Sequence, residues 1–585
     1  MDERAVLGLV FVSLLLVPPV AQPGSTQPAG NPDVALKNIA TFGLLDSNSL
    51  DCRRIWTSVG DGQISSEYGS VVAAARDVNR DGYDDILVGS PLYSTAKNAS
   101  AGKAYLYFGG PSGPSKTPAW TSVGDDSFVA YFGASIAADD LNLDGYADVI
   151  IGAPGYLQWS ERGRGHAGKI YVFHGSPTGL GAEPAQTILG DRNFENYFGL
   201  NLAVVGDVDG NGYPDLVVSH GRYVGVSRIY LYLNGPSGFS AKPAWQFPAE
   251  GAFDSILGES IGGADVDGDG NRDLVVADPF YYSNSNSSSF EGKVYVFSGG
   301  PKGWASTPSR SWVGTRYRGL FGRYTASGGD VNGDGYDDIA IGALGAVELH
   351  QGTARGATAN ATWATNGNWT DFLGQGLALD GDLTGDGLDD LLLGAMGHDE
   401  PQFVDTGELR IYSGRRSGLL SSPDVVVSGD PEPYAHFGWA VAFAGKVDGI
   451  LGDEFIVGHR SFWVGAQTPG KAYVFTCGPR SEARVSLQVD PKTLNLKSNG
   501  NWITARIEVD RASPADIEST SLTLNGVPAA WVHLVHNETL MAKFDRAAFA
   551  ATVSIGENLV ILEGRWKDGG AFRATDTIRV IRPGR

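Results

Sequence analysis

Short apolar runs recur along the first 480 positions of the chain, and six of them directly follow an acidic, glycine-containing stretch. The runs are rich in Val, Ile and Leu and end at Gly or Pro, as in ILVGSP from Ile86 and VIIGAP from Val149. A continuous apolar run of this length, bounded by turn residues, is typical of a buried strand. The pattern therefore predicts a β-rich chain.

Two further kinds of segment repeat in the same order. The first mixes aromatic and aliphatic residues and begins near residues 104, 169, 229, 293, 346, 409 and 471; the second often carries a Trp and begins near residues 119, 186, 244, 311, 361 and 425. Each unit opens with an aromatic–Gly or Leu–Gly pair: Tyr68-Gly69, Phe132-Gly133, Phe198-Gly199, Leu257-Gly258, Phe321-Gly322, Leu373-Gly374 and Phe437-Gly438. Four short strands in each of seven units predict a seven-bladed β-propeller.

Each acidic stretch places oxygen-bearing side chains at loop positions 1, 3, 5 and 9, with a Gly at position 6. Alternate carboxylates, a Gly for the sharp turn and a main-chain carbonyl at position 7 are how a short loop wraps Ca2+. We therefore predict about six structural Ca2+ ions, one in each of the six loops. The predicted ligands, with the position-7 residue offering its carbonyl, are Asp77, Asn79, Asp81, Tyr83 and Asp85; Asp140, Asn142, Asp144, Tyr146 and Asp148; Asp207, Asp209, Asn211, Tyr213 and Asp215; Asp265, Asp267, Asp269, Asn271 and Asp273; Asp330, Asn332, Asp334, Tyr336 and Asp338; and Asp382, Thr384, Asp386, Leu388 and Asp390.

The EF-hand is the competing calcium motif, and it requires a Glu at loop position 12 and a helix on each side. Position 12 is instead an apolar residue inside the following strand in all six loops: Val88, Ile151, Val218, Val276, Ile341 and Leu393. Each loop is therefore predicted to connect two strands. Ligand positions of the six loops hold 19 Asp, so the net charge of −22 is largely a signature of cation binding. The same negative charge argues against nucleic acid and anionic membranes as partners. Because no segment after Val17 has the apolar length to span a membrane, we expect no membrane insertion.

The seventh unit departs from the metal pattern. Lys446 occupies position 1 and Ile450 position 5, while Asp448 and Glu454 keep carboxylates at positions 3 and 9. A Lys ammonium beside two carboxylates would replace the missing cation. The alternative is a plain surface turn, and the sequence leaves both interpretations open.

The order Phe-Gly, acidic loop and Gly-Ala-Pro resembles the FG-GAP repeat, and the array is similar to the seven-bladed propeller at the N-terminus of integrin α subunits. The resemblance covers roughly residues 46–479. Gly-Ala-Pro is complete only at 152–154, and it becomes Gly-Ser-Pro at 89–91. No segment resembles the inserted ligand-binding domain or the membrane helix of an animal integrin. The resemblance implies a stand-alone secreted FG-GAP protein.

The N-terminus indicates export. An apolar run from Ala5 to Val17 is followed by Pro18-Pro19-Val20-Ala21, which is typical of a secretory signal peptide. The run is too short for a membrane-spanning helix. We assign residues 1–21 to the signal and 22–45 to a linker, and predict a secreted protein, with the periplasm or cell surface as alternative locations.

A second domain is predicted over residues 481–585. The glycine-rich repeat stops there, and six or seven segments that alternate apolar and polar residues follow, including ARVSLQVD and NWITARIEVD. This pattern predicts an Ig-like β-sandwich. The stretch from Val489 to Val509 is also similar to a C-terminal sandwich module of secreted prokaryotic proteins. We interpret it as a spacer or interaction module.

Cys52 and Cys477 are the two cysteines of the chain. Cys52 precedes IWTSVGD, a match to the fourth-strand segment of the first unit, whereas Cys477 ends the third strand of the seventh. If the N-terminal strand completes the last blade, the two residues lie side by side. A disulfide would then close the ring in an oxidising compartment. Two unrelated thiols are the alternative.

Long loops of the second and fourth units carry the candidate recognition residues Tyr156, Trp159, Arg162, Arg164, Tyr281 and Tyr282. Such residue types dominate binding hot spots and stack on sugars; the alternative is tolerated surface insertion. The leading hypothesis is extracellular binding or adhesion, with an unidentified extracellular protein or glycan as partner. We do not expect an enzyme. A polysaccharide- or lipid-acting enzyme and a structural surface or matrix component are the alternative functions.

Overall fold

The computed structural model describes residues 50–582 apart from short stretches. The stretches left out are residues 161–162, 191–196, 222–226, 251–254, 284–288, 302, 317, 451, 461–467, 480–483, 499, 511–516, 536–538 and 567–570. The predicted signal (1–21) and linker (22–45) lie outside the described residues.

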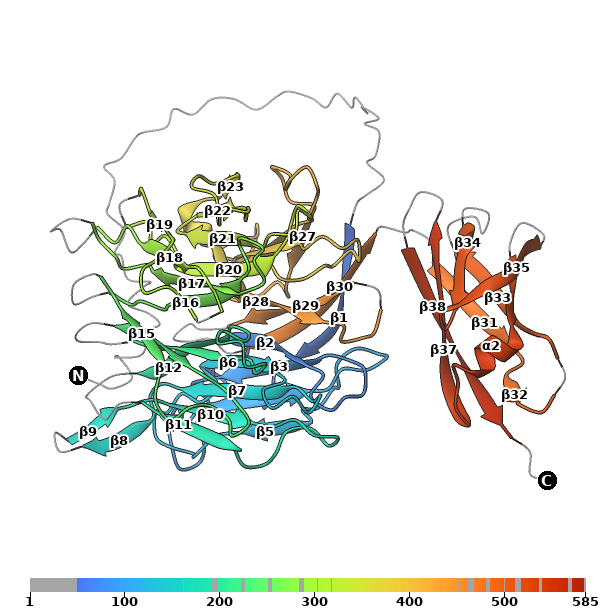
Figure 1. Ribbon diagram of the computed structural model, residues 1–585, viewed down its shortest axis with the longest axis horizontal. Helices are drawn as coiled ribbons and strands as arrows, with labels where there is room; N and C mark the ends of the chain where they lie inside the picture. Colours follow the sequence, from blue (N-terminus) through green and yellow to red (C-terminus); the bar gives the residue numbers. More distant parts are fainter. Residues whose placement is uncertain are drawn as a thin grey trace. The chain divides into compact units, whose positions relative to one another are not determined.

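Seven four-stranded antiparallel sheets make up residues 50–479, and they are the blades of the predicted propeller (Figure 1). The first strands are β2 (Val71–Arg76), β6 (Ser135–Asp139), β12 (Phe198–Val204), β16 (Ser260–Ala264), β20 (Tyr324–Gly329), β24 (Leu373–Ala378) and β28 (Phe437–Gly445). Each first strand contacts the first strands of both neighbouring blades, and β28 contacts β2. The first strands therefore surround the propeller axis and the ring is closed.

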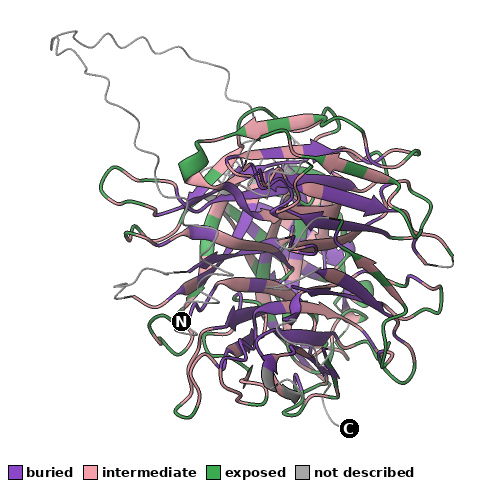
Figure 2. Ribbon diagram, turned by 90° about the vertical axis from the view of Figure 1, so that its left-hand side faces the viewer, coloured by how far each residue is buried: buried purple, intermediate pink, exposed green. Residues whose placement is uncertain are grey.

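The second strands are the apolar runs of the sequence, and nearly all their residues are buried: β3 (Asp85–Ser90), β7 (Asp148–Ala153), β13 (Leu216–His220), β17 (Asp273–Asp278), β21 (Asp338–Ala343), β25 (Leu391–Ala395) and β29 (Glu454–His459). The third strands are β4 (Lys103–Tyr107), β10 (Lys169–Phe173), β14 (Arg228–Tyr232), β18 (Lys293–Phe297), β22 (Ala346–His350), β26 (Glu408–Tyr412) and β30 (Lys471–Pro479). Figure 2 shows buried strands between exposed loops. Apolar side chains of adjacent blades pack into shared cores, which joins the sheets.

The fourth strands lie at the outer edge and alternate half-buried and exposed residues in most blades. They are β5 (Trp120–Ser122), β11 (Gln186–Leu189), β15 (Trp245–Pro248), β19 (Arg310–Val313), β23 (Trp363–Asn366), β27 (Val425–Ser428) and β1 (Leu50–Ser58). Their Trp residues connect blades: Trp120 Nε1 donates to the Gly181 carbonyl at 2.9 Å, and Trp363 Nε1 to the Leu420 carbonyl at 2.8 Å. A buried or edge Trp with a satisfied N–H combines apolar area with a directional bond.

The ring closes as expected. β1 pairs with β30 in antiparallel register, Cys52 lies opposite Cys477, and the two form a disulfide. Short additional elements decorate the blades: the hairpin β8 (Leu157–Ser160) and β9 (Gly163–His166), and the 3-10 helix η1 (Trp369–Asp371).

In its described residues, the second domain has eight strands and one short helix. They are β31 (Arg484–Asp490), β32 (Thr493–Asn495), β33 (Trp502–Asp510), β34 (Ile517–Leu524), β35 (Val527–Val535), β36 (Thr539–Asp545), α2 (Arg546–Ala550), β37 (Gly556–Trp566) and β38 (Ala571–Ile581). β34 and β35 pair only through the residues flanking their turn, so the sheet divides there into two layers around one apolar core. The sandwich-like architecture is confirmed. The expected six or seven strands become eight because β32, a three-residue strand parallel to β38, has too few residues to show a pattern.

Candidate metal centre

Each of the six acidic loops joins the first and second strands of its blade, as predicted. The position-1 carboxylate organises the loop by accepting main-chain N–H groups from positions 5 and 6. In the first loop, Asp77 accepts from Asp81 at 3.1 Å and from Gly82 at 2.9 Å. The same pair of bonds recurs in the other five loops. Gly82 has a φ of 92°, a conformation that favours Gly.

The side-chain oxygens at positions 3 and 5 each accept a hydrogen bond from the main-chain N–H two residues further along the loop. Asn79 Oδ1 accepts from the Asp81 N–H at 3.0 Å, and Asp81 Oδ1 accepts from the Tyr83 N–H at 3.1 Å. These bonds curl the chain around the side-chain oxygens. A loop of this shape presents its oxygens inward without help from a helix.

Position 9 is buried, and both of its oxygens are hydrogen-bonded. Asp85 accepts from the Val78 N–H at 3.0 Å and from the Gly109 N–H, which follows the third strand, at 2.9 Å. All six position-9 aspartates make this double contact. Burial raises the pKa of Asp85 to about 7 and that of Asp390 to about 8. A nearby cation would favour the ionised carboxylate that burial disfavours.

Two loops bring three carboxylates together within the described residues. One oxygen each of Asp207, Asp209 and Asp215 lie within 4.8 Å of one another, and so do oxygens of Asp265, Asp267 and Asp269. These are the two loops with Asp at position 3; the other four have Asn or Thr there. The donor sets consist of oxygen and fit a hard divalent cation. Ion binding by each of the six loops, and the total number of ions, stay predictions.

The segment of the seventh unit also joins the first and second strands of its blade, but its contacts differ. Glu454 is fully buried, and its oxygens accept from the Thr476 hydroxyl at 3.0 Å and from the Asp448 N–H at 3.3 Å. Burial and the neighbouring Asp448 carboxylate raise the pKa of Glu454. Lys446 is exposed, and among the described residues its ammonium makes no ion pair with Asp448 or Glu454. The geometry favours the plain surface turn over a built-in cation.

Neighbouring loops are bonded to each other, which the sequence reasoning missed. The Asp265 N–H donates to Asp337 Oδ2 at 2.7 Å, and the Asp337 N–H donates to the Asp265 carbonyl at 3.0 Å. Each such pair joins position 1 of one loop to position 8 of the next. Three other pairs repeat it: Asp330 with Asp389, Asp382 with Asp453, and Lys446 with Asp84. The Asp-Asp doublets at 84–85, 337–338 and 389–390 were the available signal.

His174 is a second residue that sequence reasoning missed. It follows β10, and its Nδ1 lies 3.2 Å from Asp148 Oδ2 and 3.4 Å from Asn142 Nδ2. Both partners are predicted ligands of the second loop. The hydrogen bond to Asp148 raises the pKa of His174.

Two of the six candidate recognition residues, Tyr156 and Tyr281, make contacts within their own blades. Tyr156 and Tyr281 each lie against the ammonium of a third-strand lysine, Lys169 at 5.1 Å and Lys293 at 4.9 Å from the ring centroid. Tyr93 and Lys103 form the same contact in the first blade, at 5.0 Å. The two tyrosines therefore belong to a recurring contact within the blades.

The other four candidate recognition residues are Trp159, Arg162, Arg164 and Tyr282. Trp159 and Arg164 are cross-strand partners in the β8–β9 hairpin, and Tyr282 is half-buried. Arg162 lies outside the described residues. Partner binding by any of the six residues stays a prediction.

Comparison with known proteins agrees with this geometry. The FG-GAP repeat family matches residues 68–107, 132–173, 257–297 and 322–358, and an FG-GAP-like repeat family matches residues 207–276. Blades one to five therefore contain FG-GAP or FG-GAP-like repeats, and blades six and seven have the same four-strand order.

The propeller region is also similar in sequence to integrin α subunits. Integrin alpha-5 of Xenopus laevis is 34% identical over 197 residues, which are 32% of this chain and 18% of that protein. Integrin alpha-8 of Mus musculus is 37% identical over 197 residues, 32% of this chain and 17% of that protein. Integrin alpha pat-2 of Caenorhabditis elegans is 37% identical over 175 residues, 27% of this chain and 14% of that protein. The chain thus matches under a fifth of the length of these relatives.

Two features bear on the compartment. The disulfide between Cys52 and Cys477 is typical of proteins in oxidising surroundings. Among the helices of the described residues, none has the length and apolar character needed to cross a membrane.

Proposed function

We propose that this chain is an exported, calcium-binding propeller protein that acts in extracellular binding or adhesion. Three carboxylates lie close together in each of the loops at Asp207 and Asp265, and this observation supports calcium binding most directly. Neither group contains a His or Cys ligand, and oxygen-only sets suit Ca2+ better than zinc or copper.

Calcium has a structural role in this proposal. Each loop connects the first two strands of a blade, and four contacts between position 1 and position 8 join loops of adjacent blades. A cation that neutralises one loop therefore stabilises its own blade and the contact with a neighbour. We propose one Ca2+ in each of the six acidic loops.

Export is supported by the disulfide and by the predicted signal over residues 1–21. Binding or adhesion is supported by the sequence relationship to proteins named integrin α. We propose an extracellular protein or glycan as the partner, and we expect no catalytic turnover.

The test is a calcium count followed by a partner screen. Native mass spectrometry of the exported protein is expected to find six bound ions, and calcium titration is expected to raise the melting temperature. The same protein is then applied to a glycan array and to extracellular matrix proteins, with calcium or chelator. A protein that takes up no calcium, or that binds no surface in either condition, contradicts the proposal.

A further inference from the structure

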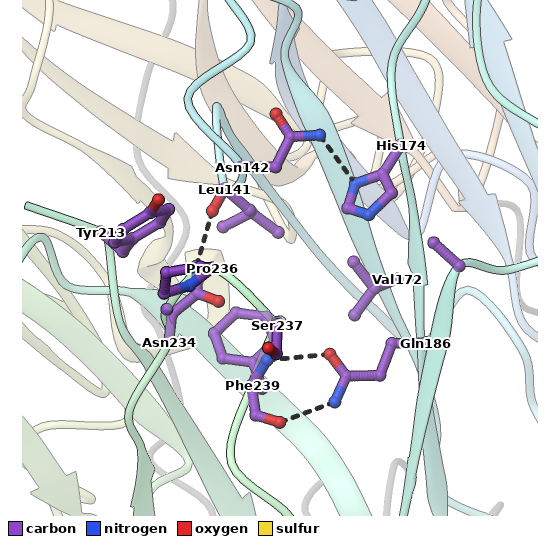
Figure 3. A pocket seen from close by; sticks show the side chains of 13 residues that line it. Leu141, Asn142, Val172, His174, Gln186, Tyr213, Asn234, Pro236, Ser237 and Phe239 are labelled. Atoms are coloured by element: carbon purple, nitrogen blue, oxygen red, sulfur yellow. Dashed lines mark hydrogen bonds between the residues drawn. The ribbon is translucent and has the colours of Figure 1, made fainter.

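A cavity of about 410 Å3 lies between the second and third blades, beside their acidic loops (Figure 3). The second blade contributes the loop at Leu141 and Asn142, the end of β10 and the start of β11. The third blade contributes Tyr213 and the turn between β14 and β15. The volume falls in the range of pockets that hold small molecules.

Hydrogen bonds between the blades hold the walls of the cavity. Gln186 makes two bonds to the main chain of Phe239: its Nε2 donates to the carbonyl at 2.7 Å, and its Oε1 accepts from the N–H at 2.9 Å. Asn234 Nδ2 donates to the Leu141 carbonyl at 2.7 Å. Because these bonds cross between blades, the cavity is formed before any ligand arrives.

His174 offers a fixed polar group to the cavity. Its Nδ1 faces Asp148 and Asn142 at 3.2 and 3.4 Å, and its other ring nitrogen, Nε2, points into the space above Val172 (Figure 3). A histidine held through one nitrogen presents the other in a set direction. The Tyr213 and Ser237 side chains also line the cavity.

The composition of the lining indicates the class of ligand. Lys, Arg, Asp and Glu are absent from the lining residues that the structure describes, and the imidazole of His174 already faces the Asp148 carboxylate, so an ionic ligand finds no charged side chain that lacks a counter-charge. The nearly buried apolar side chains of Leu141, Val172 and Phe239 line the cavity next to imidazole, amide and hydroxyl groups. A sugar ring has the matching combination of apolar C–H faces and hydroxyl edges.

We propose that this cavity binds one neutral pyranose ring, as a free sugar or as the terminal residue of a glycan. The inference rests on the proposed extracellular binding function and narrows its partner to a glycan at a named site. It also places recognition next to the acidic loops rather than on the predicted recognition loops.

A matched cavity provides the control. Between the fifth and sixth blades, a space of about 280 Å3 occupies the equivalent position. Its lining contains Arg416 and Trp363, where the first cavity has Pro236 and Gln186. The fold therefore produces a cavity at both places, and the side chains set what each accepts. Ser417 is the counterpart of Ser237 in the turn at the edge of the cavity.

The experiment uses the full exported chain with calcium and a panel of neutral hexoses and N-acetylhexosamines. Saturation-transfer NMR identifies a bound sugar, and titration calorimetry gives its affinity and stoichiometry. We expect one site per chain. Ser237→Trp, which fills the cavity from an exposed turn, and His174→Ala are each expected to weaken binding by about tenfold or more. Ser417→Trp and Gln351→Ala, the matched changes between the fifth and sixth blades, are expected to leave it unchanged.

Native mass spectrometry checks that both sets of variants keep their calcium and their fold. The inference is overturned if no sugar of the panel binds more tightly than about 10 mM, or if Ser237→Trp binds as well as the unaltered protein. It is also overturned if Ser417→Trp alone removes binding. If the sugar site fails while the unaltered chain still adheres to an extracellular protein, the proposed function stands and only this site is wrong.

Discussion

Cys52 of β1 and Cys477 of β30 are opposite residues of one antiparallel strand pair, 425 positions apart in the sequence. β1 is the fourth strand of the seventh blade, so that blade is assembled from both ends of the propeller sequence. Ring closure consequently depends on pairing between two segments that are far apart in the sequence, and the disulfide links them covalently. In the other six blades, all four strands are consecutive apart from the inserted β8–β9 hairpin.

Loss of the disulfide should destabilise the propeller. For a closed loop of this size the chain-entropy model gives about 5–6 kcal/mol as an upper estimate for the Cys52→Ser, Cys477→Ser double variant. Peptide mapping without reduction should recover both cysteines in one species. Limited proteolysis of the reduced protein should cut near β1 first. Two free thiols in the exported protein would contradict the bonded closure.

Removal of calcium should lower the melting temperature of the propeller by many degrees. Aspartates in one loop repel each other without a cation, and an ion bound only by the folded state adds about 2.7 kcal/mol per site at 100 times its Kd. Differential scanning calorimetry in calcium and in chelator measures the shift. Magnesium at equal concentration is the control, since it prefers a smaller octahedral site. Equal melting temperatures would exclude a structural role for calcium.

The loops should differ in calcium affinity. The loop at Asp265 offers four carboxylates, whereas the loop at Asp382 offers three and a Thr at position 3. More anionic ligands generally bind Ca2+ more tightly. Asp269→Ala should therefore cost more stability at limiting calcium than Asp386→Ala. The reverse order, measured by calcium titration of melting temperature, would show that loop rigidity sets affinity.

The seventh loop should bind no calcium and should respond to pH through Glu454. Its pKa is raised by burial and by Asp448, so the folded state favours the protonated form. Stability from this group is therefore present at low pH and is lost as pH rises through the folded-state pKa. Glu454→Gln, which mimics the protonated group, should melt higher than the unaltered protein at pH 9 and similarly at pH 5. Lys446→Ala should have little effect on the melting temperature at either pH. A large loss of stability would instead favour Lys446 as a replacement for the missing metal ion.

Acid should weaken the seventh blade through His436. Its pKa is lowered to about 4, first by burial and then by the charge of Arg460. An unfolded histidine titrates near pH 6.5. Because the unfolded chain takes up the proton first, stability falls by about 1–3 kcal/mol as pH drops from about 6.5 to 4. His436→Leu should reduce this dependence in chemical denaturation, and the part that remains would come from His459, whose pKa is also lowered by burial. Parallel curves for His436→Leu and the unaltered protein would be the contrary result.

The propeller could be predicted because the sequence of each blade repeats the same kinds of segment in the same order. The β1–β30 pairing followed from one local match, IWTSVGD against the fourth-strand segment. In contrast, β32 was missed because three residues carry no periodicity. Sequence order alone also cannot place Asp337 against Asp265, since that contact depends on how two blades pack.

In the acidic loops, too, local features could be predicted from the sequence, whereas contacts between distant segments could not. Their side-chain alternation identified the oxygens at positions 1, 3, 5 and 9, because those positions are local. The second bond of Asp85, to Gly109 beyond the third strand, is not local. Nor is the approach of His174 to Asp148, which requires the register of β10 against β7.

Leu50 lies opposite Pro479 at the open end of the β1–β30 pair, with the strands running in opposite directions. In a propeller without residues 480–585, a short hairpin turn would therefore connect the two ends of the propeller sequence. New termini could then be opened in the segment between β5 and β6, which yields a circular permutant with seven blades of consecutive strands. In such a chain the bond between Cys52 and Cys477 would lie within a single hairpin, and it would no longer enclose the ring.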